Sequence, residues 1–445
     1  MAPSPTTPST TQPTMPSAGQ QPPDSPLLDR VPGAVPLPSG GGTPGGTASA
    51  PDAGVAWHYG DPMREQRLLA AGEAVTDLSH RGLLIVTGEA RLSWLQALTT
   101  QQVSDLAPGR PVESLVLSPY GHVEHALHLV DDGERAWISV DATSMRPALD
   151  PASTAEPLAD WLRSMRFRTR VTIEDVTGQW AAIGMVLAPD AALPPAVQAA
   201  VDAAFAAADA PDGTGPVPPS WQDPWPAPGE NTGLYTAGTL DDHPGWRRPW
   251  REVWVPRAGF ADAVAALPLA GSWASEALRV AAWRPRAGCD TDHRTLPHEV
   301  DWMRTGLHLN KGCYRGQETV SRVHHLGKPP RRLVMLHLDG SEHDLPAAGD
   351  PVYLMPGAGA GGGSGDPDES ADVPGGVASV RQGRPVGQVT SPVRHHEWGP
   401  IALALVKRSL PTDAALRVLP AGASPEGERG QAASQEAIVA DATIS

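Results

Sequence analysis

Residues 311–318 read Lys-Gly-Cys-Tyr-Arg-Gly-Gln-Glu, the densest cluster of chemically reactive residue types in the chain. The two glycines in this segment allow the backbone to turn tightly and to approach a neighbour closely. The residues from Gln317 onward have the pattern of a helix, which predicts that Cys313 lies just before a helix N-terminus. There the exposed amides and the positive end of the helix dipole favour anions and lower the pKa of a thiol. Lys311 and Arg315 add positive charge on either side of the cysteine.

An isolated cysteine is more often a buried, inert thiol, and glycines often do no more than form a turn. Here Lys, Cys, Arg, Gln and Glu converge within one short segment. That convergence favours a functional thiol at Cys313 over a structural one.

The composition excludes some kinds of partner. The chain has 445 residues, 34 basic and 50 acidic, and a formal net charge of −16. This balance disfavours a protein that coats nucleic acid or anionic lipid through bulk charge, although a local basic site remains compatible with it. No apolar run is long enough to span a membrane. Two cysteines, Cys289 and Cys313, indicate a reducing compartment, and with no targeting pattern at the N-terminus they predict a cytoplasmic protein.

Composition also divides the chain. Proline, glycine, serine and threonine dominate residues 1–54, which predicts a disordered leader. Alternating strand-like and helical patterns then predict an α/β or α+β body, and short β-type runs predict a small all-β domain after it. The predicted divisions are a body over 55–328 with a proline-rich surface insertion at 210–232, a β-barrel domain over 329–420 with a glycine-rich loop at 357–376, and a flexible tail over 421–445.

The segment at 311–318 resembles the signature of the folate-binding YgfZ family, whose members are related to the glycine-cleavage T-protein, an aminomethyltransferase. Other segments resemble that family in the same order along the chain. They are Leu98–Val103 with Leu106, Pro108 and Gly109; Leu117–Val123; Arg286, Gly288 and Asp290; Pro297 and Glu299; Gly387, Val389, Thr390 and Ser391; and Leu403–Val406. The resemblance therefore extends over roughly residues 60–410.

The resemblance implies a T-protein-like α+β fold, with several subdomains around a central cleft and a C-terminal β-barrel. It implies tetrahydrofolate, or a one-carbon derivative of it, as the ligand of the cleft. Because two cysteines cannot supply the four thiolates of a cluster site, we expect no permanently bound metal. It implies a role in the assembly or repair of iron–sulfur clusters, with iron–sulfur client enzymes or assembly proteins as partners.

The same resemblance supplies the candidate site residues. Cys313 is the candidate functional thiol, with Lys311 and, more weakly, Glu124 beside it. A pterin ring needs hydrogen-bonding groups at its edge and an aromatic plane beside it, and the folate tail is anionic and suits basic residues. The candidates for binding folate are Tyr314, Arg315, Gly316, Gln317, Glu318, Glu299, Arg286, Trp302 and Arg322.

One departure from the T-protein pattern bears on catalysis. T-proteins carry an aspartate after the turn that corresponds to Gly121–Val123, whereas here Glu124, His125 and Ala126 follow that turn. Glu124 can replace the aspartate only if its strand points it inward. The preferred interpretation is therefore an accessory protein that is not an aminomethyltransferase. A folate-dependent one-carbon transferase and a scaffold that has lost folate binding are the alternatives.

Three histidines, His122, His125 and His128, suggest a metal site by their spacing alone. On a strand, however, positions three apart face opposite sides, so three ligands would not converge on one ion. We therefore do not expect a metal site there.

Overall fold

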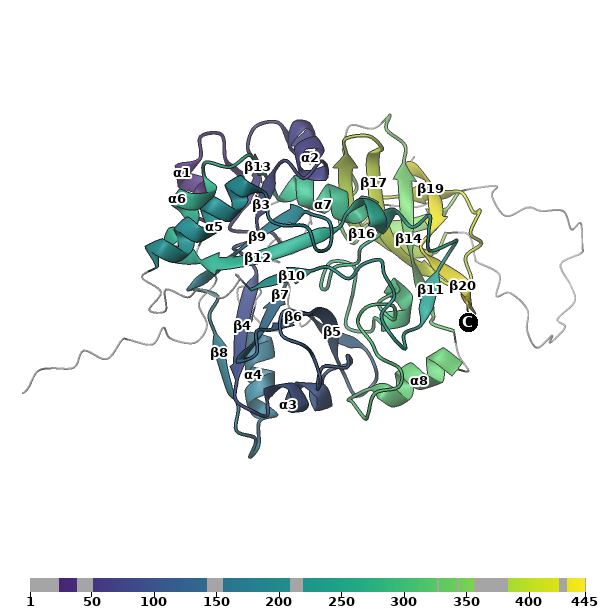
Figure 1. The fold of residues 1–445 in the computed structure, drawn as a ribbon. Helices are drawn as coiled ribbons and strands as arrows, with labels where there is room; N and C mark the ends of the chain where they lie inside the picture. Colours follow the sequence, from purple (N-terminus) through teal and green to yellow (C-terminus); the bar gives the residue numbers. More distant parts are fainter. Residues whose placement is uncertain are drawn as a thin grey trace, which may run out of the picture.

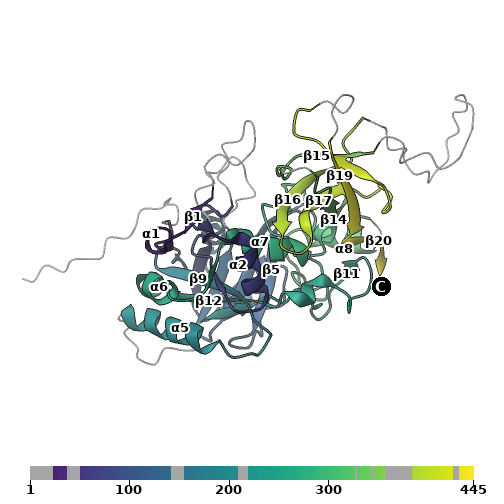
Figure 2. The ribbon, with the colours of Figure 1, turned by 90° about the horizontal axis from the view of Figure 1, so that it is seen from above.

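The computed structural model of the chain describes residues 24–37, 51–141, 155–208, 219–325, 328–341, 344–355, 383–423 and 430–444. Two five-stranded sheets form the body, and a closed six-stranded barrel lies beside them (Figure 1). The view from above places the barrel to one side of both sheets (Figure 2). The predicted α+β body with a C-terminal β-barrel is confirmed.

The first sheet has the strand order β5-β6-β7-β4-β8, and all its neighbouring strands are antiparallel. Apolar side chains on one face of it form a core with two helices, α3 and α4. The bounds are β4 Gly82–Thr87, α3 Arg91–Leu98, β5 Pro111–Leu117, β6 Val123–Asp131, β7 Arg135–Val140, α4 Glu156–Ser164 and β8 Thr172–Asp175.

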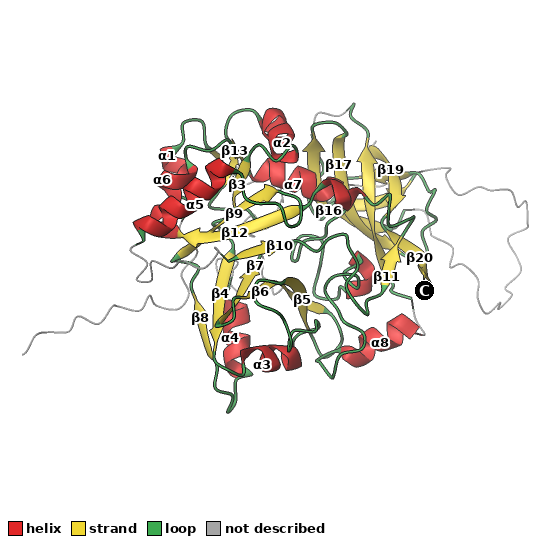
Figure 3. Ribbon diagram, in the orientation of Figure 1, coloured by secondary structure: helices red, strands yellow, loops and turns green. Residues whose placement is uncertain are grey.

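The second sheet has the order β10-β12-β9-β3-β13, in which only β13 and β3 are parallel. Helices α5 and α6 pack on this sheet, as Figure 3 shows in red against yellow strands. The bounds are α2 Pro62–Ala70, β3 Val75–Asp77, β9 Trp180–Val186, α5 Pro195–Ala207, β10 Ser220–Gln222, β12 Trp250–Pro256, α6 Arg257–Val264, β13 Leu269–Ala270 and α7 Ser272–Ala281. Asp61 caps α2, because its side chain accepts a hydrogen bond from the Arg64 amide.

The barrel closes in the order β14-β17-β16-β15-β18-β19. Its strands are β14 Arg331–Leu338, β15 Pro351–Leu354, β16 Gly387–His395, β17 Gly399–Lys407, β18 Leu416–Val418 and β19 Gln431–Ala437. The remaining elements are α1 Leu27–Arg30, β1 Val35–Pro36, β2 Ala56–His58, β11 Leu234–Thr236, η1 Pro244–Arg247, η2 Pro297–Val300, α8 Gln317–His325 and β20 Val439–Ile444.

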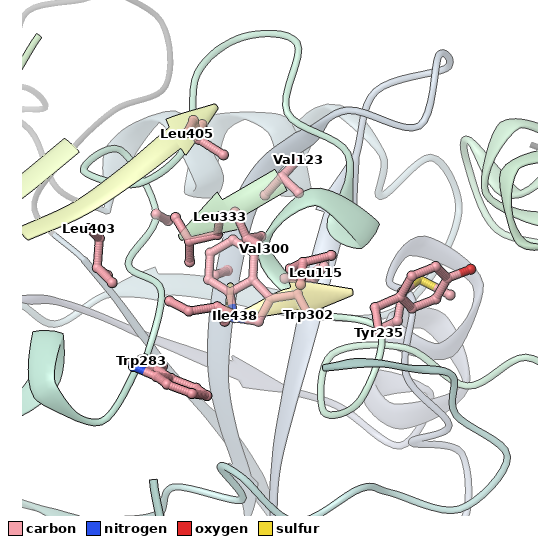
Figure 4. Close-up of a cluster of buried hydrophobic side chains, with 14 of the residues drawn as sticks. Leu115, Val123, Tyr235, Trp283, Val300, Trp302, Leu333, Leu403, Leu405 and Ile438 are labelled. Carbon is pink, nitrogen blue, oxygen red and sulfur yellow. The ribbon is translucent and has the colours of Figure 1, made fainter. Parts of the chain in front are cut away.

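An apolar cluster joins the barrel to the body. Figure 4 shows Leu333, Leu403 and Leu405 of the barrel gathered with Val300 and Trp302 of the body, all of them buried. Because a buried leucine contributes about 1.5–3 kcal/mol, this cluster stabilises the two units as one structure.

Polar contacts reinforce the same junction. The Asp290 carboxylate accepts hydrogen bonds from the hydroxyls of Thr390 (2.5 Å) and Ser391 (2.7 Å). The body and barrel segments that carry the family resemblance are thus in direct contact.

Part of the predicted leader differs from the prediction. Residues 24–37 contain a short helix and a short strand, and the side chain of Leu27 is fully buried in the core beneath α5 and α6. Asp52 is also buried, and it pairs with Arg286 of the body. Composition averaged over the segment concealed these individual contacts. Residues 1–23 and 38–50 lie outside the described residues.

The predicted proline-rich surface insertion also needs correction. Its residues 219–232 include β10, which pairs with β12, and Trp221 and Trp225 are both buried. The two tryptophans supply large apolar surfaces to the core, which explains why the segment packs into the body despite its prolines. Residues 210–218, and the glycine-rich loop at 357–376, lie outside the described residues.

The predicted flexible tail is wrong for its described part. Strand β19 closes the barrel between β14 and β18, and β20 pairs with β11 of the body. The sequence of β19 is Gln-Ala-Ala-Ser-Gln-Glu-Ala, whose small and polar side chains conceal the alternation of a strand.

Candidate functional site

A polar pocket lies between the two sheets of the body, lined by side chains from β5, β6, β10, β12 and the chain after α7. Its charged lining consists of five arginines, Arg81, Arg248, Arg279, Arg284 and Arg286, and four carboxylates, Glu113, Asp141, Asp223 and Glu252.

Most of these charges are paired. Arg284 donates to Glu113 (2.6 Å) and to Asp223 (3.0 Å), and Arg286 donates to Asp141 (3.0 Å) and to Asp52 (2.9 Å). Burial lowers the pKa of Arg284, but its two carboxylate partners outweigh burial and raise it. The pocket is therefore built from charge pairs that fix the direction of each guanidinium group.

Several donors in this lining nevertheless have no hydrogen-bond partner among the described residues. They are buried and belong to Arg81 (Nε), Arg248 (Nε), Arg284 (Nη1), Arg286 (Nη2) and Trp302 (Nε1). Because a buried unpaired donor costs about 1–3 kcal/mol, such a group is a candidate for binding a ligand acceptor.

Arg248 differs from the other pocket arginines in its pairing. It is 8% exposed, and its nearest carboxylate, Asp223, lies at 3.6 Å. Its guanidinium carbon lies 4.1 Å from the ring centroid of Trp250, so stacking holds the group in place. Burial lowers the pKa of Arg248 to about 9, against the charge of Asp223. Arg248 is thus a buried cation with an incompletely satisfied charge.

His128 also lines the pocket. Its ring stacks on Trp221 with centroids 3.7 Å apart, and its Nδ1 lies 3.3 Å from Glu252. Burial raises the pKa of Glu252, but the charges of Arg81 and His128 bring it down to about 2. Across the described residues, no three His, Cys, Asp or Glu side chains gather as a metal site would require.

Of the predicted folate-binding residues, Arg286 and Trp302 line this pocket, whereas residues 311–318 do not. The residues of the predicted site therefore fall into two separate groups. One lines the buried pocket, and the other is the segment 311–318 at the start of α8. The prediction that α8 begins at Gln317, just after the cysteine, is confirmed.

The second glycine of the motif fixes its turn. Gly316 has a φ of +82°, and a Cβ atom there would lie 2.5 Å from the carbonyl oxygen of Ser118 and 2.9 Å from the Cα of Gly121. It packs against the turn at 118–121, another segment of the family resemblance. By contrast, nothing lies within 4 Å of a Cβ placed on Gly312. Only Gly316 is required for the close approach that the sequence predicts.

Lys311 holds the motif against α3. Its ammonium group donates to the backbone carbonyls of Gln96, Thr99 and Gln101, at the C-terminal end of that helix. Burial lowers the pKa of Lys311 to about 8. An ammonium group has three hydrogens, and these three carbonyls accept one each. Lys311 therefore positions the motif against α3. Its predicted role beside the thiol stays a prediction.

Glu124 and Arg315 form an ion pair of 2.8 Å. In the pairing of β5 with β6, Leu117 lies opposite Val123 and Val116 opposite His125, so Glu124 is an extra, bulged residue. A bulge interrupts the alternation of a strand and redirects a side chain. Glu124 therefore meets Arg315 of the motif and is not part of the pocket lining.

Glu299 is fully buried and lies at the junction with the barrel. Its carboxylate accepts hydrogen bonds from the Leu296 amide (3.1 Å) and from the guanidinium of Arg331 at the start of β14 (2.8 Å). Arg331 also forms two hydrogen bonds with Asp292, of 2.6 and 3.0 Å. The structure thus gives Glu299 a partner in the barrel.

The other predicted residues lie on or near α8. Tyr314 is buried, and burial raises its pKa to about 12. Gln317 is partly exposed. Glu318 and Arg322 form an exposed pair of 2.7 Å on α8. None of the four lines the pocket, so their predicted role in folate binding stays a prediction.

The two cysteines differ in accessibility. Cys313 is exposed, whereas Cys289 is partly covered. Burial raises the pKa of the Cys289 thiol well above its usual value, and nearby arginines oppose this only in part. Since the thiolate is the reactive form, Cys289 is the less reactive of the two at neutral pH.

Sequence reasoning missed Arg248, Arg284 and Glu113 as pocket residues. Arg284 stands two positions before Arg286, which offers a weak signal. Arg248 lies in the run Trp-Arg-Arg-Pro-Trp at 246–250, and nothing in that run separates it from the exposed Arg247.

No protein-family model matches the chain. The iron-sulfur cluster assembly factor IBA57 homologue, mitochondrial, of Aspergillus oryzae is 33% identical over 140 residues, which are 30% of this chain and 28% of that protein. The protein of the same name from Cryptococcus neoformans is 24% identical over 273 residues, 60% of this chain and 67% of that protein. An aminomethyltransferase of Chromobacterium violaceum is 28% identical over 110 residues, 24% of this chain and 28% of that protein. The chain thus spans less than a third of the length of the Aspergillus relative.

A solved structure covers nearly the whole chain. The glycine cleavage system aminomethyltransferase T of Bartonella henselae matches 93% of this chain and 95% of its own, with a TM-score of 0.59 and 16% identity. The predicted T-protein-like fold is confirmed. At this identity the likeness concerns the fold alone.

The predicted cytoplasmic location is wrong. The fungal relatives that the chain matches are named as mitochondrial proteins. The prediction rested on few cysteines, which indicate a reducing compartment without saying which one. No helix in the described parts of the chain is long and apolar enough to cross a membrane.

Proposed function

We propose that the protein binds a reduced folate in the body pocket and supports the assembly or repair of iron–sulfur clusters, with Cys313 as its functional thiol. The observation that carries the proposal is the set of buried, unpaired donors in the pocket of a T-protein-like fold. The names of the fungal relatives support the iron–sulfur role.

The residues present in the pocket fit a folate. Unpaired guanidinium donors suit the oxygen and nitrogen acceptors of a pterin, and the pocket carboxylates suit its N–H groups. Trp302 and Trp221 supply apolar planes, as small-molecule sites commonly do. Arg248, Arg284 and Trp302 would hold the ring, and a bound reduced folate would supply a carrier for one-carbon units.

The thiol acts outside this pocket. Cys313 is exposed, and the turn fixed by Gly316 presents it before α8. A cysteine thiolate is a soft ligand that suits iron–sulfur chemistry, and an exposed position allows transient contact with a client. Folate binding and the thiol are therefore separate parts of the proposed function, and each has its own test.

The transferase alternative receives less support. Glu124, the candidate to replace the T-protein aspartate, lies on a bulge and pairs with Arg315. A carboxylate held by an arginine outside the pocket lining is poorly placed to act on a ligand inside it. This arrangement favours the accessory role.

Replacing Arg248 by Met should weaken the binding of a reduced folate at least about tenfold, because a hydrogen bond to a charged group contributes about 1.5–3 kcal/mol. Tetrahydrofolate is titrated into the protein under anaerobic conditions, and binding is followed by tryptophan fluorescence and calorimetry. Arg247→Met is the matched control, since Arg247 precedes it in sequence and is exposed. The proposal fails if the wild type shows no saturable binding, or if both variants bind as the wild type does.

Cys313→Ser should remove the fast-reacting thiol and abolish support of cluster-dependent enzymes, while Cys289→Ser should leave both intact. The reason is the exposure of Cys313 and the raised pKa of Cys289. Thiol reactivity is measured with a chromogenic disulfide, and function by the activity of an iron–sulfur enzyme in a strain deleted for the endogenous factor and rescued by this chain. Full rescue by Cys313→Ser would exclude the thiol role.

A further inference from the structure

A strongly basic surface follows helix α4. Residues 163–170 read Arg-Ser-Met-Arg-Phe-Arg-Thr-Arg, and all four arginines are exposed. Arg163 pairs with Asp160 on its own helix (2.9 Å), whereas the structure gives no ion pair to Arg166, Arg168 or Arg170 among the residues it describes. In a chain with a net charge of −16, this cluster is opposite in sign to the whole. We name residues 163–170 the arginine turn.

An exposed aromatic side chain lies at the centre of the arginine turn. Phe167 is 84% exposed, more than any other large hydrophobic side chain in the described residues. Its φ is +46°, in the left-handed region that costs a bulky residue about 1–2 kcal/mol. Backbone strain of this kind clusters at functional sites. Exposed aromatic and arginine side chains are the types that concentrate binding energy in protein interfaces.

Helices α4 and α3 connect the arginine turn to the thiol motif. The guanidinium carbon of Arg315 lies 5.9 Å from the ring centroid of Trp161, on α4. The indole of Trp94 on α3 donates to the Met165 carbonyl in the turn (3.3 Å). At the C-terminal end of α3, the backbone carbonyls of Gln96 and Thr99 accept hydrogen bonds from the Lys311 ammonium. Figure 1 shows α3 and α4 together at the lower edge of the molecule, with α8 beyond α3.

A second exposed aromatic residue lies at the motif itself. Tyr120 is 72% exposed, and its turn packs against Gly316. Tyr120 and the arginine turn thus lie on either side of segments that contact the thiol motif, the first through Gly316 and the second through α4 and α3.

We propose that the arginine turn is a docking surface for the acidic face of a partner protein, which it brings next to Cys313. Charge complementarity indicates the chemistry of the partner. Four exposed arginines attract an acidic surface and steer it to this side of the molecule. A nucleic acid is disfavoured because the rest of the chain repels an extended polyanion. The inference rests on the proposed role of Cys313, and adds the chemistry of its partner.

The test uses a synthetic, glutamate-rich helical peptide that carries a few leucines. A fluorophore is attached to Cys313, which the raised pKa of Cys289 favours over the second thiol. The peptide should bind saturably, shift the emission of the fluorophore, and bind more weakly as salt rises. A lysine-rich peptide of the same pattern should not bind.

Variants locate the binding surface. Arg166→Glu/Arg168→Glu/Arg170→Glu and, separately, Phe167→Ala should each weaken peptide binding about tenfold or more. The control is Arg64→Glu/Arg67→Glu/Arg247→Glu, which changes the net charge equally at exposed sites away from the turn, and should bind within about twofold of wild type. Circular dichroism checks that the variants are folded.

Three outcomes overturn the docking surface: no binding of the acidic peptide, equal loss in the control and turn variants, or binding only of single-stranded DNA or phosphatidylserine vesicles. Titration of the same variants with tetrahydrofolate separates this inference from the proposed function. The arginine-turn variants should keep folate binding, because none of their residues lines the pocket. If the wild type itself does not bind tetrahydrofolate, the folate proposal is overturned, whereas the peptide result is unaffected.

Discussion

Arg331→Met should destabilise the protein by about 3 kcal/mol or more, because it leaves the fully buried Glu299 carboxylate without its cation. Arg331 begins β14 and also holds Asp292, so its loss removes the charge pairs that join the barrel to the body at this point. Urea-induced unfolding followed by tryptophan fluorescence measures the change.

The control for this prediction is Arg322→Met. Arg322 forms an exposed pair with Glu318 on α8, and such a pair contributes about 0.5 kcal/mol or less. A comparable loss of stability in the two variants would contradict the account of the junction.

The effect of Arg331→Met should also depend on pH. Burial raises the pKa of Asp292, but hydrogen bonds from Arg331 bring it well below its usual value. A carboxyl with a lowered pKa contributes stability at neutral pH, and this contribution disappears as the pH falls and the group is protonated. The difference between wild type and variant should therefore shrink below about pH 4.

Gly316→Ala should destabilise the protein by about 2 kcal/mol or more and slow the reaction of Cys313 with a thiol reagent. An alanine at a φ of +82° is strained, and its Cβ would lie 2.5 Å from the Ser118 carbonyl oxygen. The backbone must move, and the turn that presents Cys313 moves with it. Unfolding in urea and the rate of thiol modification measure the two effects.

Gly312→Ala provides the matched comparison, in the same motif. Its φ is not in the left-handed region and nothing lies within 4 Å of the added Cβ, so the expected change is within about 1 kcal/mol and in the stabilising direction. If both glycine variants lost stability equally, the packing of the motif against residues 118–121 would not explain the requirement for glycine.

The helices and most strands of the body could be predicted because their signals are local. Asp61 followed by Pro62 predicts the start of α2, and the apolar run at 82–87 predicts β4. Strand β19 escaped prediction because its small and polar residues show no alternation, and a neighbouring strand on each side stabilises it instead.

The candidate site could be predicted only in part. Cys313 before α8, and the close approach at Gly316, follow from residue types within one short segment. The direction of Glu124 does not, because a bulge at that residue redirects its side chain and a strand pattern carries no record of the bulge.

By itself, the sequence determined most helices and strands of the body, the turn at Gly316 and the place of Cys313 just before α8, since each depends on neighbouring residues. The tertiary structure decided which charges are paired. Glu113 meets Arg284 across 171 positions, and Asp52 meets Arg286 across 234. A buried arginine is neutralised, or left to bind a ligand, according to which carboxylate the fold brings beside it. No residue near Arg248 in the sequence indicates that its nearest carboxylate, Asp223, lies 3.6 Å away.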